Sequence, residues 1–340
     1  MTGTDPATTA EIEAARLLLD RLGVTIEQLA GPIPADADVP TFAEYIPRVA
    51  AAVATGTRKV YQTYWNRILD QWGDRRLHEP TATEIQTLAE QTKKTVVVRS
   101  NARGGHLAAE HLIAAMRCLY RHAIADGHLP EQRNPAIRVA KPRRLPSARR
   151  ALLDTQLAAI NHTATTTGND RDLDGLLIRL HVETACRRGG ALALRPVDLD
   201  PTQCLIRLRE KGGTDRWQPV SPSLMRQLRL HHNQRGNDEP RKPLLRYING
   251  RPISRRRYDR LWQRLGGYLP WVATQQISTH WLRHTTLTWV ERHYGYGVAR
   301  AYAGHNSRTD FGVTATYVRA DLYEVAIALE ALTGEPHPLT

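Results

Sequence analysis

The segment "STHWLRHTTLTWV", residues 278–290, places two imidazoles and a guanidinium at the start of an apolar, Thr-rich stretch. His280 and Arg283 are three residues apart, so on a helix their side chains share one face. Such a pair is typical of an ordinary basic helix surface, and it also suits one side of a site that binds a phosphate. The rest of the sequence distinguishes between these two interpretations.

Composition indicates a globular chain with a polyanionic partner. The 340 residues exceed one ordinary domain, and a hydrophobic content of 41% can fill real cores. The net charge of +13 points to nucleic acid first, with an anionic membrane surface as the alternative. No apolar run approaches the roughly 20 residues that a membrane span needs, and the N-terminus lacks the basic start of a secretory signal. We therefore expect a cytoplasmic protein without a membrane anchor.

The cysteines do not form a recognisable framework. Cys118, Cys186 and Cys204 are odd in number and far apart, which supports neither a disulfide scaffold nor a CxxC metal site. We therefore expect no bound metal and no cofactor.

Proline-rich and basic segments divide the chain. Hydrophobic periodicity predicts a helical extension, a small helical bundle, a basic linker and a mixed C-terminal domain, over residues 1–38, 39–140, 141–150 and 151–340 respectively. The basic linker is either a solvated tether or a segment that lies along a phosphate backbone, and we favour the second interpretation.

One segment of the C-terminal domain is not helical. Around "LIRLREKGGTDRWQPV", residues 205–220, apolar and basic residues alternate on both sides of Gly212 and Gly213, which predicts a β-hairpin. Lys211 stands at the end of its first strand. Elsewhere the pattern is helical, with a first helix that ends at Gly23 and a helix from Thr41 that ends at Gly56. The fold class is therefore mainly α with a small antiparallel β-sheet.

Three further segments carry candidate chemistry. "TACRRGGALALRPVD", residues 184–198, places Arg187 and Arg188 at a helix start or bend. "YAGHNS" places His305 directly after a glycine that is typical of a helix end. "TATYVRADLYEVAIALEAL" places Tyr317 ahead of an amphipathic helix.

Taken in order, these residues resemble the tyrosine recombinase (phage integrase) family. Its H-x-L-R-H box is matched directly by "HWLRH", residues 280–284, and the resemblance covers about residues 41 to 335. It implies a two-domain clamp around duplex DNA, with a core-binding domain before the linker and a DNA breaking–rejoining catalytic domain after it. The catalytic residues that it implies are Arg187, Lys211, His280, Arg283, His305 and Tyr317.

The chemistry of a phosphodiester explains the basic members of this set. Cleavage builds negative charge on the non-bridging oxygens of a five-coordinate phosphorus. The guanidiniums of Arg187 and Arg283 can hold those oxygens through planar, charge-assisted hydrogen bonds, and His305 can add a third donor.

The resemblance also implies the course of the reaction. Tyr317 would attack and form a covalent 3′-phosphotyrosine, Lys211 would protonate the departing 5′-oxygen, and His280 would help the tyrosine to lose its proton. The covalent link retains the bond energy, so neither ATP nor metal is needed. The lack of a clustered Asp/Glu site argues against a two-metal nuclease.

The sequence departs from the family pattern at three places. Gly190 stands where the family usually has an acidic residue that supports the active-site Arg and His, and Glu183 is a candidate substitute. Ala185 stands where the family has glycine. His305 and Tyr317 are twelve residues apart, farther than is usual, which suggests that "RTDFG" is a small insertion.

Several neighbouring residues compete for these roles. Arg188 would face away from Arg187 and suits a phosphate or surface contact, while His284 is expected to pack or cap. Tyr302 and Tyr323 are rival nucleophiles. Tyr302 precedes the His305 segment, and the helical position of Tyr323 favours a core role.

The resemblance to this family also implies further partners. Four protomers would work on two DNA duplexes, with accessory DNA-bending or directionality proteins as additional partners and a mobile element as the genetic setting. The C-terminal helix permits packing onto a neighbouring protomer. The acidic character of residues 1–38 favours protein contacts over separate DNA sites.

Two other functions compete with recombination. A type IB topoisomerase-like enzyme would use the same chemistry as a monomer, but the separate helical domain and the apolar C-terminal helix favour the recombinase. A catalytically dead DNA-binding protein is the second alternative, because Gly190 removes a supporting carboxylate.

Overall fold

The chain forms two compact units, residues 1–146 and 147–340, here called the N-terminal and C-terminal units. This computed structural model describes residues 8–24, 39–95, 105–143, 149–209, 215–236, 239–304 and 321–340. The division falls within the predicted basic linker. A separate role for residues 1–38 and DNA binding by residues 39–140 stay predictions.

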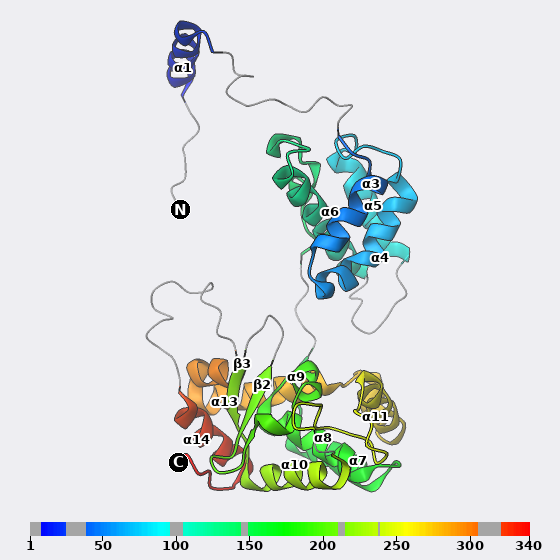
Figure 1. Ribbon diagram of the computed structural model, residues 1–340, viewed down its shortest axis with the longest axis vertical. Coiled ribbons are helices and arrows are strands. Elements are labelled where there is room, and N and C mark those ends of the chain that lie inside the picture. Colours follow the sequence, from blue (N-terminus) through cyan, green and yellow to red (C-terminus); the bar gives the residue numbers. More distant parts are fainter. Residues whose placement is uncertain are drawn as a thin grey trace. The chain divides into compact units, whose positions relative to one another are not determined.

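The regular elements in the described part of the N-terminal unit are helices (Figure 1), and an isolated antiparallel bridge joins Thr41 to Arg76. Its helices are α1 (Thr9–Leu22), α3 (Phe42–Ala52), α4 (Thr55–Trp72), α5 (Ala82–Thr95) and α6 (His106–Ala125), followed by two 3-10 turns, η3 (Glu131–Arg133) and η4 (Pro135–Ile137). Helix α1 buries no residue and ends at Gly23, whose φ of 63° is left-handed. The predicted end at Gly23 is thus confirmed.

Helices α3 to α6 surround an aromatic core. Tyr45 and Tyr120 are fully buried, and each hydroxyl donates a hydrogen bond, to Asp126 at 2.7 Å and to the carbonyl oxygen of Leu77 at 2.8 Å. Their polar ends are therefore satisfied inside the bundle.

The predicted helix end at Gly56 is wrong. The chain turns extended at Val53, so α3 ends at Ala52, and Gly56 lies in the first turn of α4. The alanine-rich sequence before Gly56 carries no strong stop signal, so its periodicity runs on past the true break.

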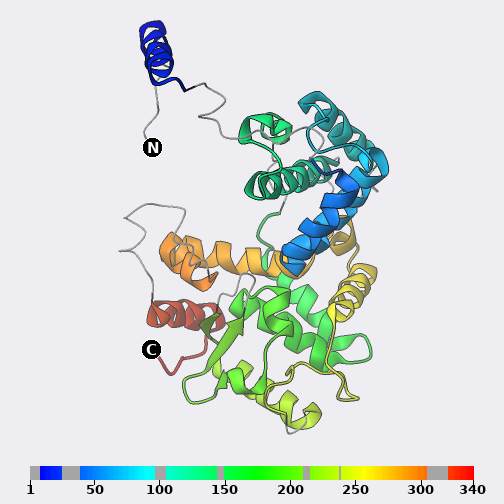
Figure 2. The same ribbon diagram turned by 45° about the horizontal axis from the view of Figure 1, so that its top comes forward.

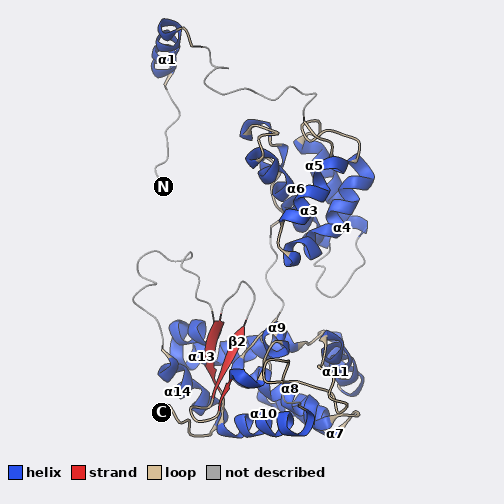
Figure 3. Ribbon diagram, viewed as in Figure 1, coloured by secondary structure: helices blue, strands red, loops and turns tan. Residues whose placement is uncertain are grey.

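The C-terminal unit combines helices with one small sheet (Figure 3). Strands β1 (Leu199–Asp200), β2 (Leu205–Arg209) and β3 (Asp215–Pro219) pair antiparallel in that order. The predicted hairpin is confirmed, with Leu205 opposite Pro219 and Arg209 opposite Asp215. The fold class, mainly α with a small antiparallel sheet, is confirmed as well.

The remaining elements of this unit are α7 (Asp154–Thr166), α8 (Arg171–Thr184), α9 (Arg188–Leu192), η5 (Pro196–Asp198), α10 (Pro222–Arg235), α11 (Arg255–Tyr268), α12 (Pro270–Thr274), α13 (Thr279–Tyr302) and α14 (Leu322–Thr333). A large apolar cluster joins α7, α8, α10 and α11 to β2, and a smaller one joins α13 and α14 to the end of α8. Helix α8 contributes to the large cluster and Ala185 at its end to the small one, so α8 connects the two.

Helix α13 is bent near its C-terminal end (Figure 2, orange). Gly295 has φ 81° and ψ 171°, which is not helical and interrupts the run from Thr279 to Tyr302. The segment after the bend brings Tyr302 back to α8, where its hydroxyl donates to the carbonyl oxygen of Glu183. The two ends of α13 can therefore contribute to one place.

Helix α14 packs on its own unit. Val325 and Leu329 are buried with residues of α13, and α14 lies beside β3 (Figure 1). Beyond it, Glu335 accepts a hydrogen bond from Arg179 at 2.9 Å. The apolar face that could have docked on a neighbouring protomer is thus used within the chain.

A buried ion cluster ties α8 to α11. Asp174 is 1% exposed and accepts hydrogen bonds from Arg257 at 2.8 Å and from Arg264 at 2.7 Å. One buried carboxylate therefore pairs with the buried guanidinium of Arg257 and the partly exposed guanidinium of Arg264.

We expect Asp174→Asn to lower the free energy of unfolding by about 3–5 kcal/mol, because it leaves buried arginine charge uncompensated. Asp215→Asn is the matched control, since the Arg207–Asp215 pair is 48% and 39% exposed and contributes at most about 1 kcal/mol. Urea unfolding of the full chain measures both. Equal, small losses in the two variants would contradict the assignment.

Candidate active site

The link between α8 and α9 carries Arg187. Ala185 ends α8 with a left-handed φ of 48°, and Arg187 is extended and caps α9. Arg187 thus stands at a helix start, one of the two positions that the sequence predicted. Ala185 thus adopts a conformation that glycine enters more easily.

Arg283 is buried where two helices end. Its side chain is in the second turn of α13, and the residue is 3% exposed. Nη1 donates to the carbonyl oxygen of Ala185, and Nη2 donates to that of Ala303 at 2.7 Å. These two residues cap the C-termini of α8 and α13, where the helix dipoles place partial negative charge. Two helix ends thus compensate a guanidinium in the interior.

His280 lies one turn before Arg283 and remains exposed. Partial desolvation lowers its pKa, and the charges of Arg149, Arg283 and Arg187 lower it further. The structure therefore brings together three of the predicted catalytic residues, Arg187, His280 and Arg283. An imidazole that stays neutral at neutral pH can accept a proton.

Arg149 also belongs to this group, although the sequence pattern placed it in the basic linker. Three residues later, the backbone N–H of Leu152 donates to Thr285 Oγ1 at 2.9 Å, which fixes the start of the C-terminal unit against α13. Segments outside helices have no periodicity, so only the basic composition of this stretch signalled a role.

Glu183 does not take over the role of the acidic residue that the resemblance leads one to expect at position 190, where this chain has glycine. Its carboxylate is 3% exposed and accepts from Arg179 at 2.6 Å and from the backbone N–H and hydroxyl of Ser221, both at 3.0 Å. The proposed support of Arg187 by Glu183 is therefore wrong, because α8 directs this side chain toward the start of α10. The carbonyl oxygens of Ala185 and Ala303 at the two helix ends supply partial negative charge beside the guanidinium of Arg283.

The competing basic residues have other contacts. Arg188 forms a surface ion pair with Asp259 at 3.1 Å. His284 Nδ1 lies 3.3 Å from the hydroxyl of Thr288 one turn later, which agrees with a packing or capping role.

The two rival tyrosines differ in accessibility. Tyr302 is fully buried, and burial raises the pKa of its phenol well above the ordinary range, so it is a poor nucleophile. Tyr323 is 51% exposed, so its predicted core role is wrong. It lies in the first turn of α14, on the side opposite the buried stripe of Val325 and Leu329.

Lys211, His305 and Tyr317 lie outside the described residues. The neighbouring elements are described: β2 and β3 flank Lys211 in sequence, and α13 and α14 flank the other two. Their catalytic roles stay predictions.

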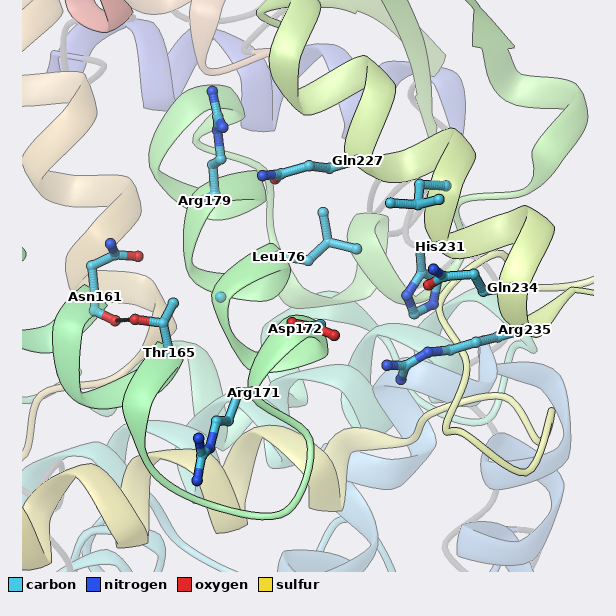
Figure 4. Close-up of a pocket in the computed structure, with 12 residues that line it drawn as sticks. Asn161, Thr165, Arg171, Asp172, Leu176, Arg179, Gln227, His231, Gln234 and Arg235 are labelled. Carbon is cyan, nitrogen blue, oxygen red and sulfur yellow. Dashed lines mark hydrogen bonds between the residues drawn. The ribbon is translucent and has the colours of Figure 1, made fainter.

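A pocket of about 430 Å³ lies elsewhere in the C-terminal unit, among α7, α8 and α10 (Figure 4). Asn161 and Thr165 face Gln227 and His231 across it, with Leu176 between them. Of the described candidate residues, Arg187, His280 and Arg283 do not line it.

Two of the arginines that line this pocket are paired with carboxylates. Arg235 forms hydrogen bonds of 2.6 and 2.8 Å with Asp170, and Arg179 pairs with Glu183 and Glu335. Carboxylates thus neutralise the charges of Arg179 and Arg235, while Arg171 also lines the pocket.

The described residues offer neither a metal site nor a membrane span. They contain no group of three or more His, Cys, Asp or Glu side chains placed to hold a metal ion. None of the helices described combines the length and the apolar character that a membrane span requires.

Comparison with known proteins identifies the family. The family model described as "Phage integrase family" matches residues 150–322. This chain belongs to the phage integrase family. The match includes Arg187, His280 and Arg283 and begins one residue after Arg149.

Curated relatives of this family member include proteins named tyrosine recombinase XerC. The one from Pelobacter propionicus is 28% identical over 177 residues, which cover 52% of this chain and 57% of that protein. The one from Chlamydia caviae is 31% identical over 140 residues, or 39% and 44% of the two chains. This integrase-family chain thus spans about half the length of the curated relatives it matches.

Solved integrase structures share the fold. A lambda integrase tetramer bound to a Holliday junction has a TM-score of 0.61 and 16% identity, and 91% of each chain is covered. The Tn1549 transposon integrase in complex with transposon right end DNA also has a TM-score of 0.61 and 16% identity, with 86% of this chain and 100% of that one covered.

Buried histidines make stability depend on pH. His181 and His231 are 1% and 5% exposed, and burial lowers the pKa of each to about 4. Below the ordinary value near 6.5, the unfolded chain binds more protons than the folded one. The free energy of unfolding should therefore fall as pH falls from about 6.5 to about 4, by about 3 kcal/mol for each histidine.

Urea unfolding at pH 7.5 and pH 5 measures this loss. Replacement of His231 with Gln keeps an acceptor for the backbone N–H of Arg246, which His231 Nε2 binds at 3.0 Å, and removes the titration. His231→Gln should lose less stability than the wild type over that interval. An unchanged pH dependence in this variant would contradict the assignment.

Proposed function

We propose that this chain is a site-specific DNA recombinase that cleaves and rejoins DNA strands through a 3′-phosphotyrosine, without metal or ATP. The observation that carries the proposal is the grouping of Arg187, His280 and Arg283 around the ends of α8 and α13. Membership of the phage integrase family supports it.

The two guanidiniums are assigned to the scissile phosphate. Arg187 and Arg283 would bind the non-bridging oxygens and stabilise the charge that develops on them. Loss of one such preorganised donor typically costs about 10²–10³ in rate. His280, with its lowered pKa, would accept the proton of the attacking phenol.

Tyr317, Lys211 and His305 complete the chemistry. The phenolic oxygen of Tyr317 forms a bond to phosphorus while the bond from phosphorus to the 5′-oxygen breaks, and Lys211 gives that oxygen a proton. His305 donates a hydrogen bond to the phosphate. The reverse steps, with the 5′-hydroxyl of a second strand, rejoin the DNA.

The assembly is proposed from charge and from the structural neighbours. The net charge of +13 suits duplex DNA, which residues 39–140 and the linker 141–150 would hold together with the C-terminal unit. The lambda integrase structure contains a tetramer on a Holliday junction, and we propose the same stoichiometry on two duplexes here. We place the protein in the cytoplasm as part of a mobile element, with accessory DNA-bending or directionality proteins as partners.

Covalent trapping tests the nucleophile. The protein is incubated with EDTA and a pool of nicked duplexes of randomised sequence, and adducts that survive denaturation are sequenced to recover the site. The wild type should form adducts, and Tyr317→Phe should form none. Tyr323→Phe is the matched control, since that tyrosine is exposed in the neighbouring helix, and it should keep full activity.

Adducts that persist in Tyr317→Phe would show that the nucleophile is a different residue. A wild type that binds DNA but never forms an adduct would favour a DNA-binding protein without catalysis. A monomer that forms adducts and relaxes supercoiled plasmid, but does not exchange strands, would favour a topoisomerase.

Lys211→Ala should slow cleavage of the recovered site by about 10²–10⁴ and leave DNA affinity nearly unchanged, because a general acid acts in the transition state. A substrate with sulfur in place of the 5′-bridging oxygen should restore the rate, since a thiolate leaves without a proton. Lys242→Ala, at an exposed position, is the control. Parallel losses of rate and affinity, with no rescue by sulfur, would exclude this role.

A further inference from the structure

Side chains hold the backbone that leads from α8 to Arg187. The N–H of Cys186 donates to Thr184 Oγ1 at 3.2 Å, and the carbonyl oxygen of Cys186 lies 3.0 Å from His181 Nδ1. The preceding carbonyl, that of Ala185, accepts from Arg283. These groups lie past the last helical turn, where the helix itself provides no partners. The link is thus fixed by residues of α8 and α13.

The hydrogen-bond directions at His181 follow from its partners. A carbonyl oxygen can only accept, so Nδ1 of His181 carries the proton and donates to Cys186. In a neutral imidazole Nε2 then accepts, and the hydroxyl of Tyr258 on α11, 3.0 Å away, must donate to it. Hydrogen bonds therefore run in one direction from Tyr258 through His181 to the Cys186 carbonyl.

This series of hydrogen bonds is shielded from water. His181 and Tyr258 are each 1% exposed, and their rings meet edge to face with centroids 5.4 Å apart. Burial lowers the pKa of His181 to about 4, so the imidazole is neutral at neutral pH. Protonation would make Nε2 a donor and remove the acceptor for Tyr258. The orientation of the imidazole is therefore set by both packing and protonation state.

The Cys186 carbonyl belongs to the same peptide plane as the N–H of Arg187. We propose that His181 and Tyr258 are positioning residues that fix this peptide and thereby aim the Arg187 guanidinium at the scissile phosphate. The inference rests on the recombinase function proposed above. A displacement of about 1 Å in a catalytic guanidinium can cost about 10²-fold in rate. The hydrogen bonds from Tyr258 through His181 to Cys186 would prevent such a displacement of Arg187.

Two substitutions of His181 separate positioning from simple core packing. The amide nitrogen of Asn stands close to the place of Nδ1 and can donate to the Cys186 carbonyl. The longer Gln side chain reaches toward Tyr258 and does not place a donor at that carbonyl. Both variants remove the ring, so a role in packing alone would affect them similarly.

Hydrogen exchange of the full chain tests the anchor without any reaction. In His181→Gln and in Tyr258→Phe, amides of residues 185–190 should exchange at least about tenfold faster than in the wild type, while those of α10 stay unchanged. His181→Asn should keep most of the protection. Unchanged exchange at residues 185–190 in both His181→Gln and Tyr258→Phe would overturn the proposal.

Single-turnover adduct formation at saturating DNA tests the consequence for Arg187. His181→Gln should reduce the rate by about 10–100-fold with unchanged DNA affinity, and His181→Asn should recover most of it. In an Arg187→Ala background His181→Gln should cause little further loss, because both changes act through one guanidinium. Additive losses would overturn the proposal.

The two experiments, hydrogen exchange and adduct formation, also separate this proposal from the function on which it rests. If the wild type forms no adduct, the recombinase function fails, and the exchange measurement alone decides whether His181 and Tyr258 hold the link.

Discussion

The burial of Arg283 between the carbonyl oxygens of Ala185 and Ala303 is the interaction on which the candidate site depends. A charged guanidinium in the interior loses several kcal/mol of hydration, and it is tolerated only where hydrogen bonds and opposing charge compensate it. Both acceptors are helix C-caps, so the ends of α8 and α13 must be in place together. The left-handed turn at Ala185 and the bend at Gly295 are the local features that allow this.

The groups that compensate the positive charge of a buried arginine matter for the chemistry of the site. Arg235 and Arg257 face full carboxylate charges in the interior and serve as structural ions. Arg283 donates to carbonyl oxygens at two helix ends, which carry about half an elementary charge each at most. Burial lowers the pKa of His280, and the positive charges of Arg149, Arg283 and Arg187 lower it further. An anion that enters such a site gains from a field that is already arranged.

Much of the fold could be predicted from periodicity, because the helices and the hairpin bury regular stripes. The site was predictable only in part. Arg187, His280 and Arg283 follow motif spacing, but Glu183 was assigned wrongly, since spacing cannot tell which way the last turn of α8 faces. Arg149 lies in an irregular segment, where no period points to a partner. The tertiary contacts of Glu183 with Arg179 and Ser221 involve distant segments that sequence alone does not connect.

The segment after α14 connects parts of the C-terminal unit that lie far apart in the sequence. Glu335 bonds to Arg179 and Ser223, and His337 Nε2 lies 3.3 Å from the carbonyl oxygen of Cys204, so the final residues close contacts with segments more than 100 positions earlier. Contacts over such sequence separations form only after the entropy of closing a long loop has been overcome. We therefore expect the segment after α14 to dock late in the folding of the C-terminal unit.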